Sequence, residues 1–200
     1  MNGRRFLALG DSYTIGEGVD ASARWPDQLA ARLRTLGVDV DAPVLVARTG
    51  WTTDELDAGI SAAGIAGVFD LVSLLIGVNN QYRGRPLGEY ATQFDALLAR
   101  GIAFAGQRAA RVVVLSIPDW SVTPFADGRD RARIAGEVDA FNAAAHAGAL
   151  RAGARWVDVT PLSRVARDGW FAADGLHPSA AQYAAWADAA LAAARAALRD

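Results

Sequence analysis

The chain has 200 residues, of which 52% are hydrophobic, and a formal net charge of −2 at pH 7. This length and hydrophobic fraction suffice for one folded domain over residues 1–200 and exclude a disordered chain. The near-neutral charge, with no long run of one sign, gives no electrostatic reason to expect nucleic acid or an anionic membrane as a partner. Cysteine is absent, which excludes disulfides, thiolate catalysis and zinc held by cysteine.

The N-terminal segment indicates where the protein is expected to reside. The apolar run after residues 1–5 is too short for the core of a signal peptide, and no stretch is long and apolar enough to span a bilayer. We therefore expect a soluble, cytoplasmic protein without stable membrane insertion. The sequence does not predict its oligomeric state.

The first apolar segment ends in a Gly-Asp-Ser tripeptide. Residues 6–9 suit one short strand, and Gly10, Asp11 and Ser12 follow directly. The end of such a strand is the usual place for a functional group in an α/β sheet. All three residue types also favour turns, so the tripeptide alone is better explained as turn chemistry.

Strands and helices alternate along the rest of the chain. Apolar runs predict further strands at 43–48, 69–76, 111–117 and 154–159. Helical spacing predicts helices that begin near residues 25, 52, 86 and 179, and another that carries Ile134, Val138, Phe141 and Ala145. The run at 69–76 is almost continuously apolar, as expected for a strand covered on both faces. These repeated strand–helix units predict a parallel sheet with helices on both faces.

The loops that follow the predicted strands carry the parts of an acyl-transfer site. Ser12 is a candidate nucleophile, but a serine hydroxyl is a poor nucleophile until a base takes its proton. Histidine suits that role because it titrates near neutral pH. The chain has two histidines, and His146 lies off the apolar stripe of its helix, so we interpret it as a solvated residue. His177, in the loop before the last helix, is the remaining candidate for the base.

Three further residues complete this hypothesis. Asp174 lies three residues before His177 and can reach its Nδ1–H, fixing the tautomer. The backbone N–H groups of Ser12 and Gly50 and the side-chain amide of Asn79 can serve as donors to an oxyanion. Each residue also has a structural explanation, since Gly50 permits a tight turn, Asn79 can form an Asx-turn, and Asp-Gly is a common turn pair. These residues occur together in one chain, and each lies in a loop expected at the same edge of the sheet. Their combination favours the catalytic interpretation.

These motifs resemble those of the SGNH hydrolases, also called the GDSL esterase/lipase family. The matching segments are Gly10-Asp11-Ser12, Gly50 within residues 48–52, Gly77-Val78-Asn79-Asn80 and Asp174-Gly175-Leu176-His177-Pro178. The resemblance implies a flavodoxin-like three-layer α/β/α sandwich with about five parallel strands. It also implies Ser12 as nucleophile, His177 as general base and Asp174 as its orienting partner, with Ser12, Gly50 and Asn79 as oxyanion donors. Two departures are Tyr13-Thr14, where the family has Leu-Ser, and Asn80, where Asp is common.

Several loop residues are candidates for contacting the substrate. Tyr82 and Arg83 lie in the loop that follows Asn79, and Arg83 could bind a carboxylate or phosphate there. Trp51 and Trp120 lie on loops expected to flank the same mouth and could line an acyl or sugar pocket. The alternatives are a solvated loop charge for Arg83 and core-edge packing for the tryptophans.

The sequence thus predicts a serine hydrolase that cleaves a small-molecule carboxylic ester, or a thioester, through an acyl-enzyme without metal or cofactor. A lysophospholipase and a carbohydrate O-deacetylase of the same mechanism remain alternatives. A non-catalytic flavodoxin-like binding module is a third alternative, and the set of Ser12, Asp174 and His177 argues against it.

Overall fold

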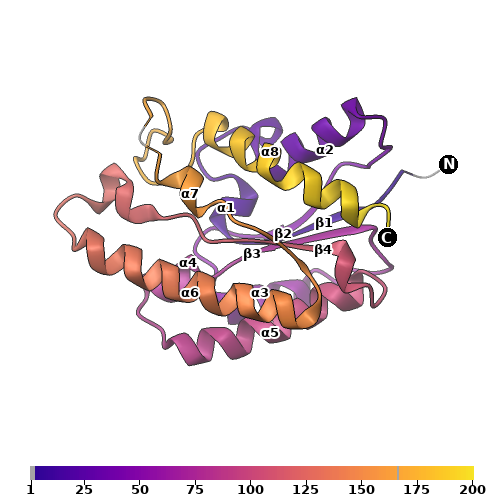
Figure 1. The fold of residues 1–200 in the computed structure, drawn as a ribbon, viewed down its shortest axis with the longest axis horizontal. Coiled ribbons are helices and arrows are strands. Elements are labelled where there is room, and N and C mark those ends of the chain that lie inside the picture. Colours follow the sequence, from indigo (N-terminus) through magenta and orange to yellow (C-terminus); the bar gives the residue numbers. More distant parts are fainter. Residues whose placement is uncertain (1–2, 166) are drawn as a thin grey trace.

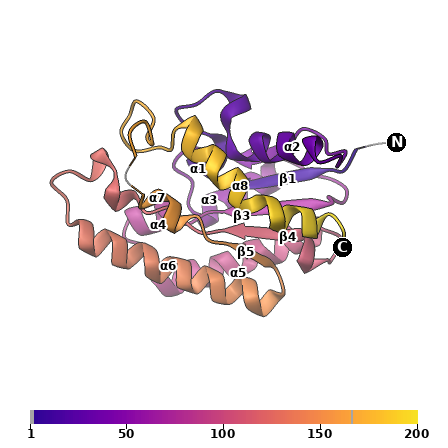
Figure 2. The same cartoon turned by 45° about the horizontal axis from the view of Figure 1, so that its top comes forward.

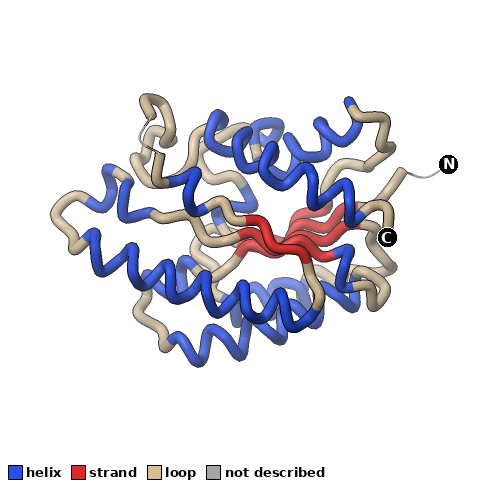
Figure 3. Tube along the Cα trace, viewed as in Figure 1, coloured by secondary structure: helices blue, strands red, loops and turns tan. Residues whose placement is uncertain are grey.

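The computed structural model describes residues 3–165 and 167–200 and has one parallel sheet at its centre. The five strands, in the spatial order β2-β1-β3-β4-β5, are β1 (Phe6–Gly10), β2 (Val44–Ala47), β3 (Leu71–Leu75), β4 (Val112–Leu115) and β5 (Arg155–Val157). Figure 3 shows the sheet between two layers of helices. This strand order is the flavodoxin-like one, so the predicted fold class is confirmed.

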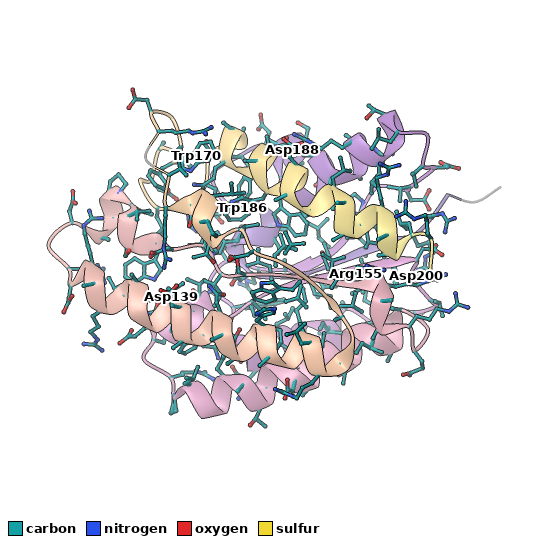
Figure 4. The ribbon with its side chains drawn as sticks, viewed as in Figure 1. Asp139, Arg155, Trp170, Trp186, Asp188 and Asp200 are labelled. Atoms are coloured by element: carbon teal, nitrogen blue, oxygen red, sulfur yellow. The ribbon has the colours of Figure 1, made fainter. Side chains whose placement is uncertain are left out.

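The long helices cover the two faces of the sheet. α2 (Trp25–Thr35) and α8 (Ala180–Ala197) pack together on one face, whereas α3 (Thr53–Ala62), α5 (Leu87–Phe104) and α6 (Arg131–Ala152) lie on the other (Figures 1 and 2). Each helix turns an apolar stripe toward the sheet; Trp186 of α8, for example, is fully buried and lies on the sheet side of its helix (Figure 4). No helix in the described part of the chain is both long and apolar enough to cross a bilayer.

Three short helices gather at one end of the sheet, away from both termini (Figure 1). They are α1 (Ser12–Ile15), α4 (Val78–Tyr82) and α7 (Thr160–Ser163). α1 follows β1 and α4 follows β3, and these adjacent strands form the point where the strand order reverses. Ligands of open α/β sheets bind in the crevice outside the strand ends at such a point, so the fold brings residues 12 and 79 toward one site.

Helix ends largely agree with the sequence prediction. The Thr52 N–H donates to the Glu55 carboxylate at 2.9 Å before α3, and the Ser179 hydroxyl accepts from the Gln182 N–H at 3.4 Å before α8. Leu36 and Leu87 continue the apolar spacing of the helices predicted from residues 25 and 86, which places them on the buried stripes, but they are 47% and 40% exposed. Leu36 lies just beyond the last residue of α2 and Leu87 is the first residue of α5, so neither is held against the sheet by a full helical turn.

The interpretation of His146 as a solvated residue is wrong. Its ring stacks on Trp156, with centroids 4.9 Å apart and planes inclined by 24°, and the side chain is half-buried between α6 and β5. The helical pattern missed this contact because Trp156 belongs to β5 and is brought beside α6 only by the tertiary fold. His146 nevertheless lies outside the crevice that holds residue 12.

Candidate active site

Ser12 begins α1 directly after β1. Gly10 is required just before it, because a Cβ there would overlap the carbonyl oxygen of Leu75 and the side chain of Thr14. Asp11 caps the short helix, its Oδ1 accepting from the Tyr13 N–H at 3.0 Å. The first N–H groups of a helix have no intrahelical acceptor, so Ser12 offers a hydroxyl and a backbone N–H that the helix itself does not use.

The loop before α8 is folded back on itself. The Ala172 N–H donates to the His177 carbonyl at 2.8 Å, and the Ser179 N–H donates to the Trp170 carbonyl at 3.0 Å. The Phe125 N–H also donates to the carbonyl of Gly175, at 3.0 Å, and pins the loop to the neighbouring turn. The loop therefore presents His177 from a fixed backbone.

Asp174 and His177 form a hydrogen-bonded pair. The Asp174 Oδ2 lies 2.6 Å from Nδ1 of His177, while its Oδ1 accepts the N–H groups of Leu176 and His177 at 2.9 Å each. Burial alone would raise the pKa of the Asp174 carboxyl, but these hydrogen bonds outweigh it and hold the pKa below its usual value. An ionised carboxylate at Nδ1 favours the tautomer with the proton on Nδ1, which leaves Nε2 as an acceptor.

The residues proposed as oxyanion donors lie on two linked segments. The Asn79 Nδ2 donates to the Trp51 carbonyl at 2.9 Å, and an amide nitrogen carries a second N–H. Gly50 has φ +87°, a conformation that disfavours a side chain, and its carbonyl accepts from Arg83 at 2.6 Å. These bonds hold the segment at residues 50–51 against α4. Asn79 itself belongs to α4, not to a loop as predicted.

Asn80 reinforces this link from a fully buried position. Its Oδ1 accepts the Thr53 N–H at 3.0 Å and its Nδ2 donates to the Thr53 hydroxyl at 2.7 Å. The Thr53 hydroxyl can then donate onward to Gln93. An aspartate would have no proton for Thr53, so the asparagine found here in place of the common aspartate fits this hydrogen-bond chain.

A pocket of about 170 Å³ at the strand ends is lined by Ser12, Asn79 and His177, whereas the predicted residues Gly50 and Asp174 do not line it. It is lined by three polar residues and six mainly apolar ones: Ser12, Asn79 and His177, with Tyr13, Val78, Tyr82, Trp120, Phe125 and Leu176. In the described part of the chain no direct hydrogen bond joins Ser12 Oγ to His177 Nε2, although both line this pocket. Catalytic hydrogen bonds often tighten only in the substrate complex. Among residues 3–165 and 167–200, no three His, Asp or Glu side chains cluster in a way that could hold a metal ion.

Two predicted substrate-contacting residues lie beside the pocket and do not line it. The Trp51 ring packs so closely against Gly59 of α3 that a Cβ at Gly59 would overlap it. The Arg83 guanidinium is held by the Gly50 carbonyl and by the Glu55 carboxylate, the latter at 3.2 Å. Both side chains support the segment around residue 50, and the structure assigns them no pocket contact.

The sequence prediction missed one residue that lines the pocket, Tyr13, and one that stacks on its aromatic rings without lining it, Arg129. Tyr13 packs its ring edge against that of His177, with centroids 5.9 Å apart, and its place directly after residue 12 was the available signal. The guanidinium of Arg129 lies over the rings of Phe125, Tyr82 and Trp120, at 4.8, 5.5 and 5.5 Å from their centroids. An arginine in an exposed turn carries no sequence pattern that reveals such stacking.

The carboxyl group of Asp11, which directly precedes the candidate nucleophile Ser12, has a raised pKa. Its side chain is fully buried, and within the described residues its Oδ2 has no hydrogen-bonding partner. Burial raises the pKa of Asp11 to about 7, against opposing hydrogen bonds from backbone N–H groups. The folded protein therefore holds a proton on Asp11 between about pH 4 and pH 7 that the unfolded chain releases.

We expect the free energy of unfolding to fall as the pH rises through this window, because the folded state binds more protons there than the unfolded state. In Asp11→Asn the amide still accepts from the Tyr13 N–H but cannot ionise. Relative to the wild type, the variant should gain about 2–3 kcal/mol between pH 5 and pH 8, measured by urea unfolding. The exposed Asp20 provides the control, since Asp20→Asn should show no such trend. A constant difference between Asp11→Asn and wild type would contradict the assignment.

The strand order, and the crevice at the point where it reverses, define a flavodoxin-like α/β protein. Comparison of the sequence with family profiles then identifies its family. The profile of the GDSL-like Lipase/Acylhydrolase family matches residues 8–185. The chain belongs to this family and is a hydrolase of the esterase or acylhydrolase type. A comparison with curated proteins finds no significant match.

Solved structures share this fold over nearly the whole chain. The crystal structure of TesA has a TM-score of 0.76 and 23% identity, covering 98% of this chain and 100% of its own. LAE5, an α/β hydrolase enzyme from the metagenome of Lake Arreo, Spain, has a TM-score of 0.72 and 24% identity, with 98% and 96% covered. Axe2, an acetylxylan esterase from Geobacillus stearothermophilus, has a TM-score of 0.74 and 19% identity, with 96% and 94% covered. At these identities the likeness concerns the fold.

Proposed function

We propose that this chain hydrolyses carboxylic esters through a covalent acyl-enzyme formed on Ser12. The observation that carries the proposal is the 2.6 Å contact between Asp174 and His177 at the pocket that Ser12 also lines. A nucleophile, a base and a group that orients the base are the three parts that acyl transfer by serine requires. These parts come from segments 162 positions apart in the sequence, yet they meet at one end of the sheet.

The first half of the reaction forms the acyl-enzyme. His177 Nε2 takes the proton of the Ser12 hydroxyl as its oxygen attacks the ester carbonyl. The Asp174 carboxylate stabilises the imidazolium that results. The tetrahedral intermediate collapses when the imidazolium gives its proton to the leaving alkoxide, which departs as the alcohol. Water then repeats the same sequence on the acyl-enzyme, releasing the carboxylic acid and the free Ser12.

Negative charge on the carbonyl oxygen needs donors that are already in place. The proposed donors are the backbone N–H groups of Ser12 and Gly50 and the Asn79 amide, whose other N–H is bound by the Trp51 carbonyl. Fixing the amide in this way avoids reorganisation when the charge develops, which is the source of most such stabilisation. The reaction uses no electron transfer and needs no metal or cofactor.

The alternatives differ in substrate more than in chemistry. Thioesters, lysophospholipids and sugar acetates are cleaved by the same steps, and Axe2, with a similar fold, is an acetylxylan esterase. A non-catalytic binding module is disfavoured, because binding alone gives no reason to pair an ionised carboxylate with a histidine beside a free serine.

Covalent labelling tests the proposal directly. A fluorophosphonate probe should modify the wild-type protein on the peptide that contains Ser12, detected by mass spectrometry, and Ser12→Ala should abolish both labelling and hydrolysis of p-nitrophenyl acetate. Ser61, exposed on α3, supplies the matched control, since Ser61→Ala should label as the wild type does. Equal labelling of wild type and Ser12→Ala would overturn the mechanism.

A further inference from the structure

Three cavities follow one another at the catalytic end of the molecule. The pocket of about 170 Å³ adjoins a small cavity of about 10 Å³, which adjoins an open cleft of about 470 Å³. Tyr13, Trp120 and Leu176 line both the pocket and the small cavity, and Ser163 and Phe171 line both the small cavity and the cleft. These shared side chains therefore separate the pocket from the small cavity and the small cavity from the cleft.

Trp120 is the dividing residue that lies outside the proposed catalytic segments. Tyr13 directly follows Ser12 and packs on His177, while Leu176 directly precedes His177. The Trp120 indole is the largest of the three side chains and only 4% exposed. It is therefore the part of the division that can vary without moving the reacting groups.

The Trp120 ring is held in place from two sides. Its Nε1–H donates to Oε1 of the buried Gln81 at 2.8 Å, and the Gln81 amide donates to Glu137 at 2.7 Å. The Tyr82 ring packs against it edge to face, with centroids 5.5 Å apart. Swinging the indole aside would leave a buried donor and acceptor unpaired, which is costly.

The backbone at Trp120 is fixed as well. The Asp119 N–H donates to the Ser163 hydroxyl at 2.8 Å, and the buried Asp119 carboxylate accepts from the Ser121 N–H at 2.9 Å. The same carboxylate pairs with Arg164 at 2.8 Å. Because backbone and indole are both anchored, Trp120 forms a rigid wall between the pocket and the small cavity.

We propose that Trp120 is the end wall of the acyl pocket and selects short acyl groups over long ones. The proposal rests on the ester hydrolysis proposed above. The alcohol must leave toward solvent once His177 protonates it, whereas the acyl group stays on Ser12, so the walled end suits the acyl group.

Chain-length profiles test this wall. Wild-type kcat/KM for p-nitrophenyl esters should peak between acetyl and butyryl and fall at least about tenfold at octanoyl, because the added methylenes find no apolar site. Trp120→Ala joins the pocket to the small cavity, so the ratio of octanoyl to butyryl kcat/KM should rise at least about tenfold. Trp156, which stacks on His146 away from the pocket, is the matched control, and Trp156→Ala should keep the wild-type profile.

The outcomes separate this inference from the function on which it rests. If the wild type hydrolyses no ester of the series, ester hydrolysis itself fails. If the wild type is active but prefers octanoyl, or if a folded Trp120→Ala keeps the wild-type profile, the wall is overturned. Should Trp120→Ala not fold, the wild type alone decides, since an ethyl fluorophosphonate should label Ser12 at least about tenfold faster than an octyl one, and the reverse order overturns the wall.

Discussion

Replacing His177 with alanine is expected to lower kcat/KM for ester substrates by about 10⁵–10⁶-fold, because Ser12 then has no group to take its proton. Asp174→Asn should cost about 10⁴-fold, since an amide N–H facing Nδ1 would place the imidazole proton on Nε2, where the base is needed. Steady-state kinetics with p-nitrophenyl acetate measures both effects. Circular dichroism and thermal melts should show both variants folded, because the His177 side chain lies at the pocket surface, 12% exposed.

The second histidine provides the control for this result. His146 is half-buried against Trp156 and lies outside the pocket, so His146→Ala should keep kcat/KM within about threefold even if it lowers the melting temperature. Equal losses in the two histidine variants, or less than about a tenfold loss in His177→Ala, would contradict the assignment of the base.

The parts of the site that the sequence predicted are those fixed by strand ends. Ser12 closely follows the end of β1, and Asn79 closely follows the end of β3. Because β1 and β3 are adjacent parallel strands, their carboxyl ends lie at the same edge of the sheet whatever the loops do. Asp174 and His177 are three positions apart, so their contact is decided by a local turn. Short-range geometry and strand order are the two features that residue patterns report well.

Side-chain direction on the loops was not predictable in the same way. Trp51 and Arg83 were expected at the pocket, but tight packing on Gly59 and bonds to the Gly50 carbonyl and Glu55 hold them beside it. These partners are brought near by tertiary packing, and no local pattern identifies them. Trp120 combines both roles considered for it, since it is buried and also lines the pocket.

The two departures from the family pattern can be explained by contacts of this chain. Tyr13, where the family has Leu, packs on His177 at 5.9 Å and on Trp186 at the same distance, which joins the pocket to the core beneath α8. Asn80, where aspartate is common, supplies the proton that the Thr53 hydroxyl accepts. Neither residue replaces a proposed catalytic group, so both fit an enzyme that keeps the chemistry and alters the supporting contacts.

Asn79→Ala is expected to lower kcat by about 10²–10³-fold with little change in KM, because the amide would act on the oxyanion and not on the ground-state ester. The same substitution also removes the bond to the Trp51 carbonyl, so a loss of activity could arise from a displaced loop. Ground-state binding distinguishes the two causes. A displaced loop would weaken the binding of a neutral, unreactive amide analogue of the ester, whereas the loss of an oxyanion donor would leave that binding nearly unchanged.

A tetrahedral boronic acid provides the complementary measurement, because its negatively charged oxygen occupies the oxyanion position on Ser12. Its affinity for Asn79→Ala should fall by the same factor as kcat/KM, which is the signature of an interaction made mainly in the transition state. Asn79→Asp should be impaired further, since a carboxylate at this position repels the charge that the amide is proposed to stabilise. If boronate affinity stays at the wild-type level while kcat falls, Asn79 acts only by holding Trp51, and Ser12 and Gly50 would be the remaining donors.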